Sequence, residues 1–167
     1  MRIAGALFLF AFFCLLGIYA GEREKNRLAE CEAFYELFGY VKNQVNYFLT
    51  PTKVMYRNFS NKVLEECGFL PTLRSHENDE VYHDIWRTSL MSCKRNLRLK
   101  QTQFSLVLDF GDCIGKNSGA IQTGSFDYYM SELRDEIDKE KEESAKNVKL
   151  YRTLGIAAGA CAAILII

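Results

Sequence analysis

The chain has 167 residues with 21 basic and 21 acidic side chains, so its net charge is zero when both histidines are neutral. Proteins that bind nucleic acid use an excess of Lys and Arg to neutralise its phosphates. This chain has no such excess, so we expect no nucleic-acid partner. Almost half of the residues are hydrophobic, which leaves room for membrane segments beside a soluble core.

The first element is an uncharged run rich in Leu and Phe over residues 3–20, preceded by a single base, Arg2. Its 18 residues span about 27 Å as a helix, close to the ~30 Å of a hydrocarbon core. A cleaved signal peptide ending at Ala20 is the alternative. Ile18 fits the small-x-small cleavage pattern poorly, so we predict an uncleaved transmembrane anchor over residues 1–20.

Residues 21–149 form one predicted soluble domain, which is long enough to bury a core. Because Arg2 and Arg152 lie outside it, the segment holds 19 bases against 21 acids, a net charge of −2. Apolar residues recur in it at three- and four-residue spacing, which predicts an all-α bundle of about five helices. The predicted helices cover residues 22–48, continuing the anchor, then 51–68, 79–93, 102–113 and 117–149.

Local signals place the ends of the early helices. Pro51 disfavours helix at Thr50 and favours a helix start immediately after it. Gly68, followed by Pro71, indicates the end of the second helix and a loop over residues 72–78.

Two further predictions concern the core. The apolar run over residues 102–113 could be a strand, but its length and the lack of a hairpin partner favour a buried helix. Gly115 then suits a C-cap, and Asn117 or Ser118 an N-cap for the last helix. Trp86, the one tryptophan of the chain, is predicted to anchor the core.

The last helix changes character along its length. Its first part has an apolar stripe, whereas acids and bases alternate from residue 132 to 149, which indicates a solvated face. We assign Glu140 and Glu143 on this face as a candidate partner surface. No charged side chain follows Arg152, so residues 150–167 are predicted to be a C-terminal transmembrane anchor.

Five residues mark the predicted boundary between water and lipid on this anchor. Lys149 and Arg152 can snorkel to the surface, and Tyr151 suits the headgroup region. Gly155 and Gly159 form a GxxxG pair, a motif for close helix contact that also arises by chance in Gly/Ala-rich segments.

The distribution of charge and cysteine predicts the side of the membrane. Arg23, Lys25 and Arg27 follow the first anchor and Lys146 precedes the second, so the positive-inside rule places the domain in the cytoplasm. The four cysteines of the domain fit neither a zinc motif nor C-x-x-C, and we interpret them as buried hydrophobes in a reducing compartment. They are Cys31, Cys67, Cys93 and Cys113.

The sequence offers little catalytic chemistry. The only histidines are His76 and His83, and the Glu80-x-x-His83 pair lacks the second copy that a di-iron bundle needs. No phosphate-binding loop or nucleophile elbow is present. A basic cluster over residues 94–100 is interpreted as a solvated turn between helices. We therefore expect no catalytic residue, metal, cofactor or small-molecule substrate.

The whole chain resembles the stage III sporulation protein AB family of endospore-forming bacteria. The resemblance rests on KLYRTLG at residues 149–155 with its Gly/Ala/Ile tail, the Thr50-Pro51 junction, Trp86 in DIWRTSL, and LDFGDCIGKNSGAIQ over residues 108–122. It implies a non-enzymatic scaffold in a channel-like sporulation complex, similar to inner-membrane platform proteins of type II secretion. It also implies, as partners, other stage III sporulation proteins, including an AA-type cytoplasmic ATPase, and a location on the mother-cell side.

Two other classes of function stay open at this point. One is a secreted or lumenal helical binding module with disulfides, released after Ala20. The other is a small membrane enzyme without a recognisable motif. The stoichiometry, and whether the two anchors pair, do not follow from the sequence.

Overall fold

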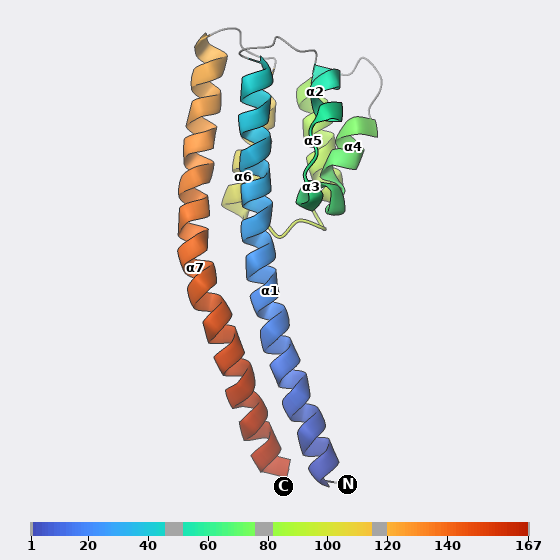
Figure 1. The fold of residues 1–167 in the computed structure, drawn as a ribbon, viewed down its shortest axis with the longest axis vertical. Coiled ribbons are helices and arrows are strands. Elements are labelled where there is room, and N and C mark those ends of the chain that lie inside the picture. Colours follow the sequence, from blue (N-terminus) through green and yellow to red (C-terminus); the bar gives the residue numbers. More distant parts are fainter. Residues whose placement is uncertain (1, 46–51, 76–81, 115–119, 167) are drawn as a thin grey trace. The chain divides into compact units, whose positions relative to one another are not determined.

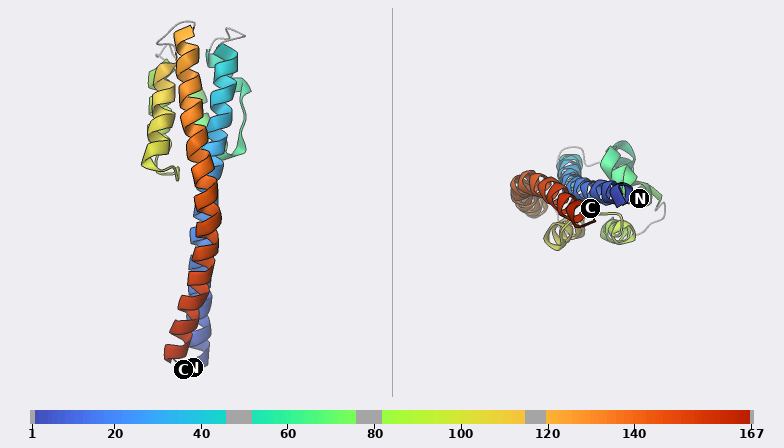
Figure 2. Two further views of the ribbon diagram at one scale, coloured as in Figure 1. Left: turned by 90° about the vertical axis from the view of Figure 1, so that its left-hand side faces the viewer. Right: turned by 90° about the horizontal axis from the view of Figure 1, so that it is seen from below.

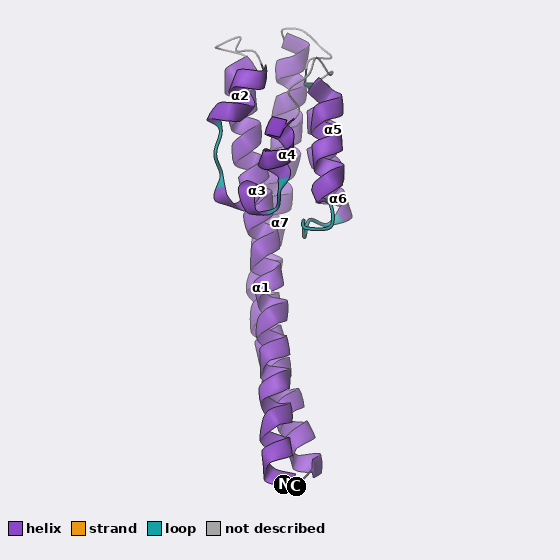
Figure 3. Cartoon of the chain, turned by 90° about the vertical axis from the view of Figure 1, so that its right-hand side faces the viewer, coloured by secondary structure: helices purple, strands orange, loops and turns teal. Residues whose placement is uncertain are grey.

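The computed structural model describes residues 2–45, 52–75, 82–114 and 120–166. All regular structure within these ranges is helical, without a strand (Figure 3), so the predicted all-α class is confirmed. The helices are α1 (Arg2–Asn43), α2 (Thr52–Asn58), α3 (Lys62–Glu66), α4 (Phe69–Ser75), α5 (Tyr82–Cys93), α6 (Gln101–Cys113) and α7 (Ala120–Ile166).

The chain divides into two compact units. The terminal unit comprises Met1–Leu28 and Lys139–Ile167, and the bundle unit comprises Ala29–Asp138. Helices α1 and α7 contribute to both units, so the prediction that the first anchor continues into the first bundle helix is confirmed. The predicted end of that helix at Phe48 lies outside the described residues.

An aromatic cluster around Trp86 forms the core of the bundle unit. The indole is fully buried and donates a hydrogen bond from Nε1 to the backbone oxygen of Val107 at 2.9 Å, which satisfies its polar atom. Rings from four elements surround it: those of Phe38, Tyr56, Phe69 and Phe110, with centroids 5.1–6.3 Å away. The predicted role of Trp86 as core anchor is confirmed.

Gly111 explains how α6 packs so closely on this indole. A Cβ at this position would lie 1.9 Å from Cδ1 of Trp86, far inside any allowed contact. Only glycine lets the α6 backbone approach the flat face of a fixed ring at this distance. The segment over residues 102–113 is helical, as predicted, and Phe110 within it stacks on Phe38 at 3.6 Å.

Two predicted boundaries in the bundle unit are wrong. The single helix expected up to Gly68 is two helices, because the Asn61 side chain accepts hydrogen bonds from the backbone N–H groups of Val63 and Leu64 and so starts α3 anew. The loop expected from residue 72 is helical to Ser75. Pro71 is tolerated because it occupies the first turn of α4, where backbone N–H groups have no intrahelical acceptor.

Gly68 separates α3 from α4 with a φ of +88°, a conformation that favours glycine, so its predicted role as a terminator is confirmed. The predicted signals at Thr50-Pro51, Gly115, Asn117 and Ser118 lie outside the described residues.

The basic segment between α5 and α6 is partly engaged within the bundle unit. Lys94 Nζ lies 4.9 Å from the ring centroid of Phe104, a cation–π distance. Arg98 donates from its backbone N–H and from Nη1 to the buried carboxylate of Glu30, at 2.6 and 3.1 Å. Much of this cluster therefore holds the turn in place.

Candidate functional site: the seam between the terminal helices

In the terminal unit the start of α1 and the end of α7 run antiparallel and side by side (Figure 1), with both chain ends at the same end of the pair (Figure 2). Their outward residues are apolar and exposed; Phe8 is 83% exposed and Leu165 is 87% exposed. Two helices, within Gly5–Asn43 and Gln122–Leu165, are long and apolar enough to cross a membrane by length and composition.

Glycines line the contact between the two helices. A Cβ on Gly17 would lie 2.6 Å from the backbone oxygen of Tyr151, and one on Gly155 would lie 2.8 Å from the oxygen of Phe13. Gly159 is equally restricted, because its Cβ would lie 2.9 Å from the Phe10 ring. The backbones are therefore closer than a residue with a side chain permits.

The glycines recur every four residues along the seam. On α7 the contact residues Tyr151, Gly155 and Gly159 follow this spacing. On α1, Gly17 lies against Tyr151 and Gly155, and Gly21 lies against Val148. Four-residue ridges that interdigitate are a common way to pack two helices, and small residues in them let membrane helices associate by close van der Waals contact. The predicted GxxxG residues thus contact α1.

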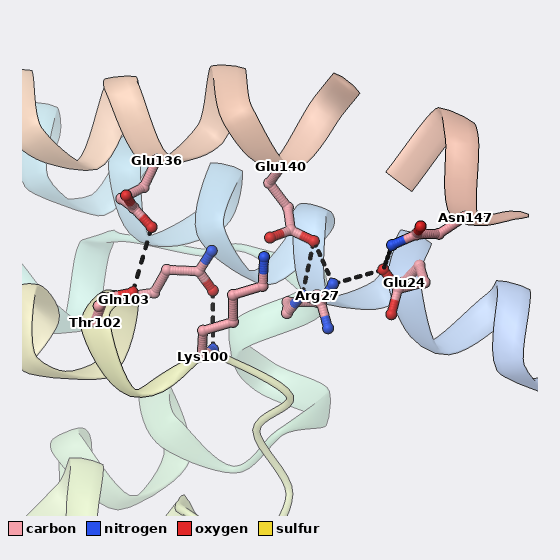
Figure 4. Close-up of polar contacts among 8 residues, drawn as sticks. All are labelled: Glu24, Arg27, Lys100, Thr102, Gln103, Glu136, Glu140 and Asn147. Carbon is pink, nitrogen blue, oxygen red and sulfur yellow. Dashed lines mark hydrogen bonds and ion pairs between the residues drawn. The ribbon is translucent and has the colours of Figure 1, made fainter. Parts of the chain in front are cut away.

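A buried polar cluster lies beside the glycine seam (Figure 4). Arg27 donates from Nε to Glu140 at 2.7 Å and from Nη2 to Glu24 at 2.6 Å. Asn147 donates from its amide nitrogen to the same Glu24 carboxylate at 3.1 Å. Glu24 and Glu140 are only 7% and 1% exposed, so charges from α1 and α7 are joined in the interior of the terminal unit.

The electrostatics of the cluster centre on Arg27. Burial by itself lowers the pKa of Arg27, but the hydrogen bonds and negative charges of Glu140 and Glu24 outweigh it and raise that pKa. Two carboxylates therefore share one permanently charged guanidinium. Removing one member of such a buried group leaves an uncompensated charge, at a cost of about 3–5 kcal/mol.

Glu140 corrects one sequence prediction. The sequence predicts a solvated partner face that contains Glu140 and Glu143, but the side chain of Glu140 turns inward to Arg27 and is buried. The reason is that Glu140 continues the buried stripe of α7, four residues before the buried Ser144. Glu143 is exposed, as expected of that face.

The predicted boundary residues flank the seam. Lys149 and Arg152 are exposed, and Tyr151 is partly buried with its backbone against Gly17. The pKa of Glu22 on α1 is lowered, first by its hydrogen bond from Lys25 and then by the charges of Lys25 and Arg152.

Sequence reasoning missed Gly17, Glu24 and Arg27 as parts of this site. Gly17 and Gly21 form a GxxxG pair that is visible in the sequence, and this signal could have identified the α1 face. Nothing in the sequence shows that Arg27 meets Glu140, because the two residues are 113 positions apart.

Among the residues that the structure describes, no group of three or more His, Cys, Asp or Glu side chains could hold a metal ion. Of the predicted Glu80-x-x-His83 pair, Glu80 and the side chain of His83 lie outside the described residues. Cys31, Cys67 and Cys93 are buried thiols, as predicted, while Cys113 is half-buried.

Comparison with known families gives one match over nearly the entire chain. The sequence model of the family described as stage III sporulation protein AB matches residues 2–167. This family is not a recognised enzyme family. Comparison with curated proteins and with solved structures finds no significant match.

Proposed function

We propose, from the premise that the chain belongs to the stage III sporulation protein AB family, that it serves sporulation as a non-enzymatic membrane scaffold. In this role α1 and α7 insert as one antiparallel hairpin, and the bundle unit is carried on a single side of the membrane. The seam of Gly17, Gly155 and Gly159 is the observation that carries the proposal. A buried contact between the two chain ends explains how 18 and 14 apolar residues can act as one anchor.

The polar cluster supports the same role. Two hydrogen bonds cross between the helices beside the apolar segments, from Arg27 to Glu140 and from Asn147 to Glu24, and each requires one relative rotation and register of α1 and α7. Two apolar helix faces can pair in several registers of similar stability, and a buried polar contact can select one of these registers. The hairpin would thus enter the membrane at a defined depth and rotation, as a scaffold needs.

The orientation follows from the bases that flank the apolar segments, which favour a cytoplasmic bundle unit on the mother-cell side. Impermeant maleimide labelling of Ser75→Cys tests this, with Cys14, Cys113 and Cys161 replaced by serine as background. Ser75 is exposed at the end of α4. The proposal predicts labelling only after permeabilisation. Labelling of intact cells refutes it, and a mature chain that starts at Gly21 supports a secreted module instead.

The partners are proposed from the resemblance to the family. We propose that the bundle unit receives an AA-type cytoplasmic ATPase and links it to other stage III sporulation proteins, as platform proteins of type II secretion do. The exposed Glu143 is the remaining candidate from the predicted partner face. Glu143→Lys should weaken co-purification of the ATPase, whereas Glu66→Lys, an exposed acid of α3, serves as the matched control. Equal capture by both variants removes Glu143 from the partner surface.

A further inference from the structure

Exposed bases gather where the apolar segments of the terminal unit end. Arg23 on α1 and Lys146, Lys149 and Arg152 on α7 are all exposed. The two helices are in contact at this level, because Gly21 lies against Val148 and Glu24 accepts from Asn147. These four bases therefore belong to one short band around the hairpin, which we call the basic band.

The acids at the same level do not neutralise this band. Glu24 and Glu140 are buried and satisfied by Arg27. Glu22 is exposed and interacts with the charge of Arg152, but it pairs with Lys25, a base outside the band, at 2.8 Å. The next exposed acids on α7, Glu142 and Glu143, lie on the far side of Lys146 from the apolar segment. The band itself thus presents four positive charges to its surroundings.

Arg152 lies deepest in the band. Its neighbour Tyr151 contacts Gly17, inside the uncharged run of α1, so Arg152 is about one helical turn closer to the chain ends than Glu22, the first charge after that run. A base at that depth reaches toward the surface by snorkelling and meets headgroup phosphates there.

We propose that the basic band binds the headgroups of anionic phospholipids and holds a shell of them around the hairpin. The partner follows from charge complementarity and from continuity with the apolar surface that lipid chains would cover. A phosphodiester headgroup offers the anionic oxygens that Lys and Arg donate to. Zwitterionic phosphatidylcholine has the same phosphate, but its own cation offsets the charge.

This inference rests on the proposed membrane insertion, so insertion is measured first. Resistance of the protein to alkaline extraction from the parent membranes shows that the hairpin inserts. Full-length protein is then reconstituted into nanodiscs of phosphatidylcholine with a minor fraction of phosphatidylglycerol of identical acyl chains. Failure of the hairpin to insert contradicts the proposed function, whereas the lipid comparison below tests the band alone.

The lipid that stays bound is then quantified by mass spectrometry of the released complexes. The wild type should retain phosphatidylglycerol over phosphatidylcholine, and each base removed should lower this preference about fivefold. The triple variant Arg23→Gln, Lys149→Gln and Arg152→Gln should therefore lose most of the preference.

A matched triple variant controls for total charge. Arg57→Gln, Lys62→Gln and Arg95→Gln removes three exposed bases of the bundle unit, far in sequence from both apolar segments, and should retain the preference. Inserted wild-type protein without any preference for phosphatidylglycerol overturns the proposal. An equal loss in both triple variants also overturns it, because the effect would then come from net charge.

Discussion

The two units of the chain hold their helices together by different physical means. In the bundle unit, Trp86 and the rings around it fill the space between helices, and apolar burial supplies most of the stability. In the terminal unit, glycines remove that space, and the polar contacts of Arg27 fix the pairing. This difference matches the solvent proposed for each unit. In water, burial of large apolar side chains stabilises a fold. In lipid, helices associate through close backbone contact and through polar groups whose hydrogen bonds are satisfied.

Both units nevertheless depend on glycine at one point of closest approach. In the bundle unit Gly111 accommodates a flat indole, whereas in the terminal unit Gly17 and Gly155 accommodate each other across the helix pair. A substitution at either place tests how far the local packing can relax.

The largest expected effect is at Arg27. Arg27→Leu removes the guanidinium that the buried carboxylates of Glu24 and Glu140 share, and should destabilise the terminal unit by about 3–5 kcal/mol. The measurement is unfolding of the full chain in mixed micelles. A variant in which Arg27, Glu24 and Glu140 are all replaced by leucine should recover most of the loss. If Arg27→Leu alone matches the wild type, the cluster does not join the helices.

A smaller effect is expected at Gly111. Gly111→Ala drives a Cβ into Trp86 and should cost about 1–3 kcal/mol through overpacking, with a change in tryptophan fluorescence. Gly124→Ala is the matched control, because that helical glycine has open space around its Cβ and alanine favours helix. Equal stability of the two variants would contradict the packing described for Trp86.

Gly155→Ala should be milder still, at about 1 kcal/mol, because two helices can separate more easily than a packed core can expand. The Cβ would meet the backbone oxygen of Phe13, so α1 and α7 must move apart. Spin labels on the two helices would report a longer distance, and Gly5→Ala, with nothing near its Cβ, should leave the distance unchanged. An unchanged distance in Gly155→Ala argues against the seam.

The smallest expected effect concerns pH and the exposed carboxyl of Glu22. Its pKa lies below the ordinary value of 4.5 in the folded protein, so its contribution to stability is present above that value and is lost as the pH falls through the folded pKa. Glu22→Gln should therefore reduce the loss of stability on acidification slightly. A larger acid sensitivity in Glu22→Gln than in the wild type would show that the sign is wrong.

Local chemistry made part of this structure predictable. The helix over residues 102–113, the burial of Trp86 and the continuity of α1 follow from periodicity and length, which act within a few turns. The break at Asn61 was missed because an asparagine N-cap is hard to distinguish from an asparagine on a helix surface.

The site was less predictable than the fold because its contacts join residues that are distant in sequence. The GxxxG motif of α7 is visible, but its partner face on α1 depends on tertiary pairing. Glu140 was placed on a solvated face because a run of alternating charges usually is one, and only its contact with Arg27 shows otherwise.

Cross-linking of the seam in native membranes tests the central claim, that α1 and α7 of one chain pair as a hairpin. Gly21 and Val148 are in contact there, with 3.5 Å between the position of a Gly21 Cβ and Val148 Cγ1. The variant Gly21→Cys with Val148→Cys, in a background with Cys14 and Cys161 replaced by serine, should form a disulfide within one chain, because the separation suits that bond. The control pair Tyr19→Cys with Val148→Cys should not, since Tyr19 is 73% exposed. A disulfide that joins two chains, or equal yields from both pairs, would contradict the hairpin.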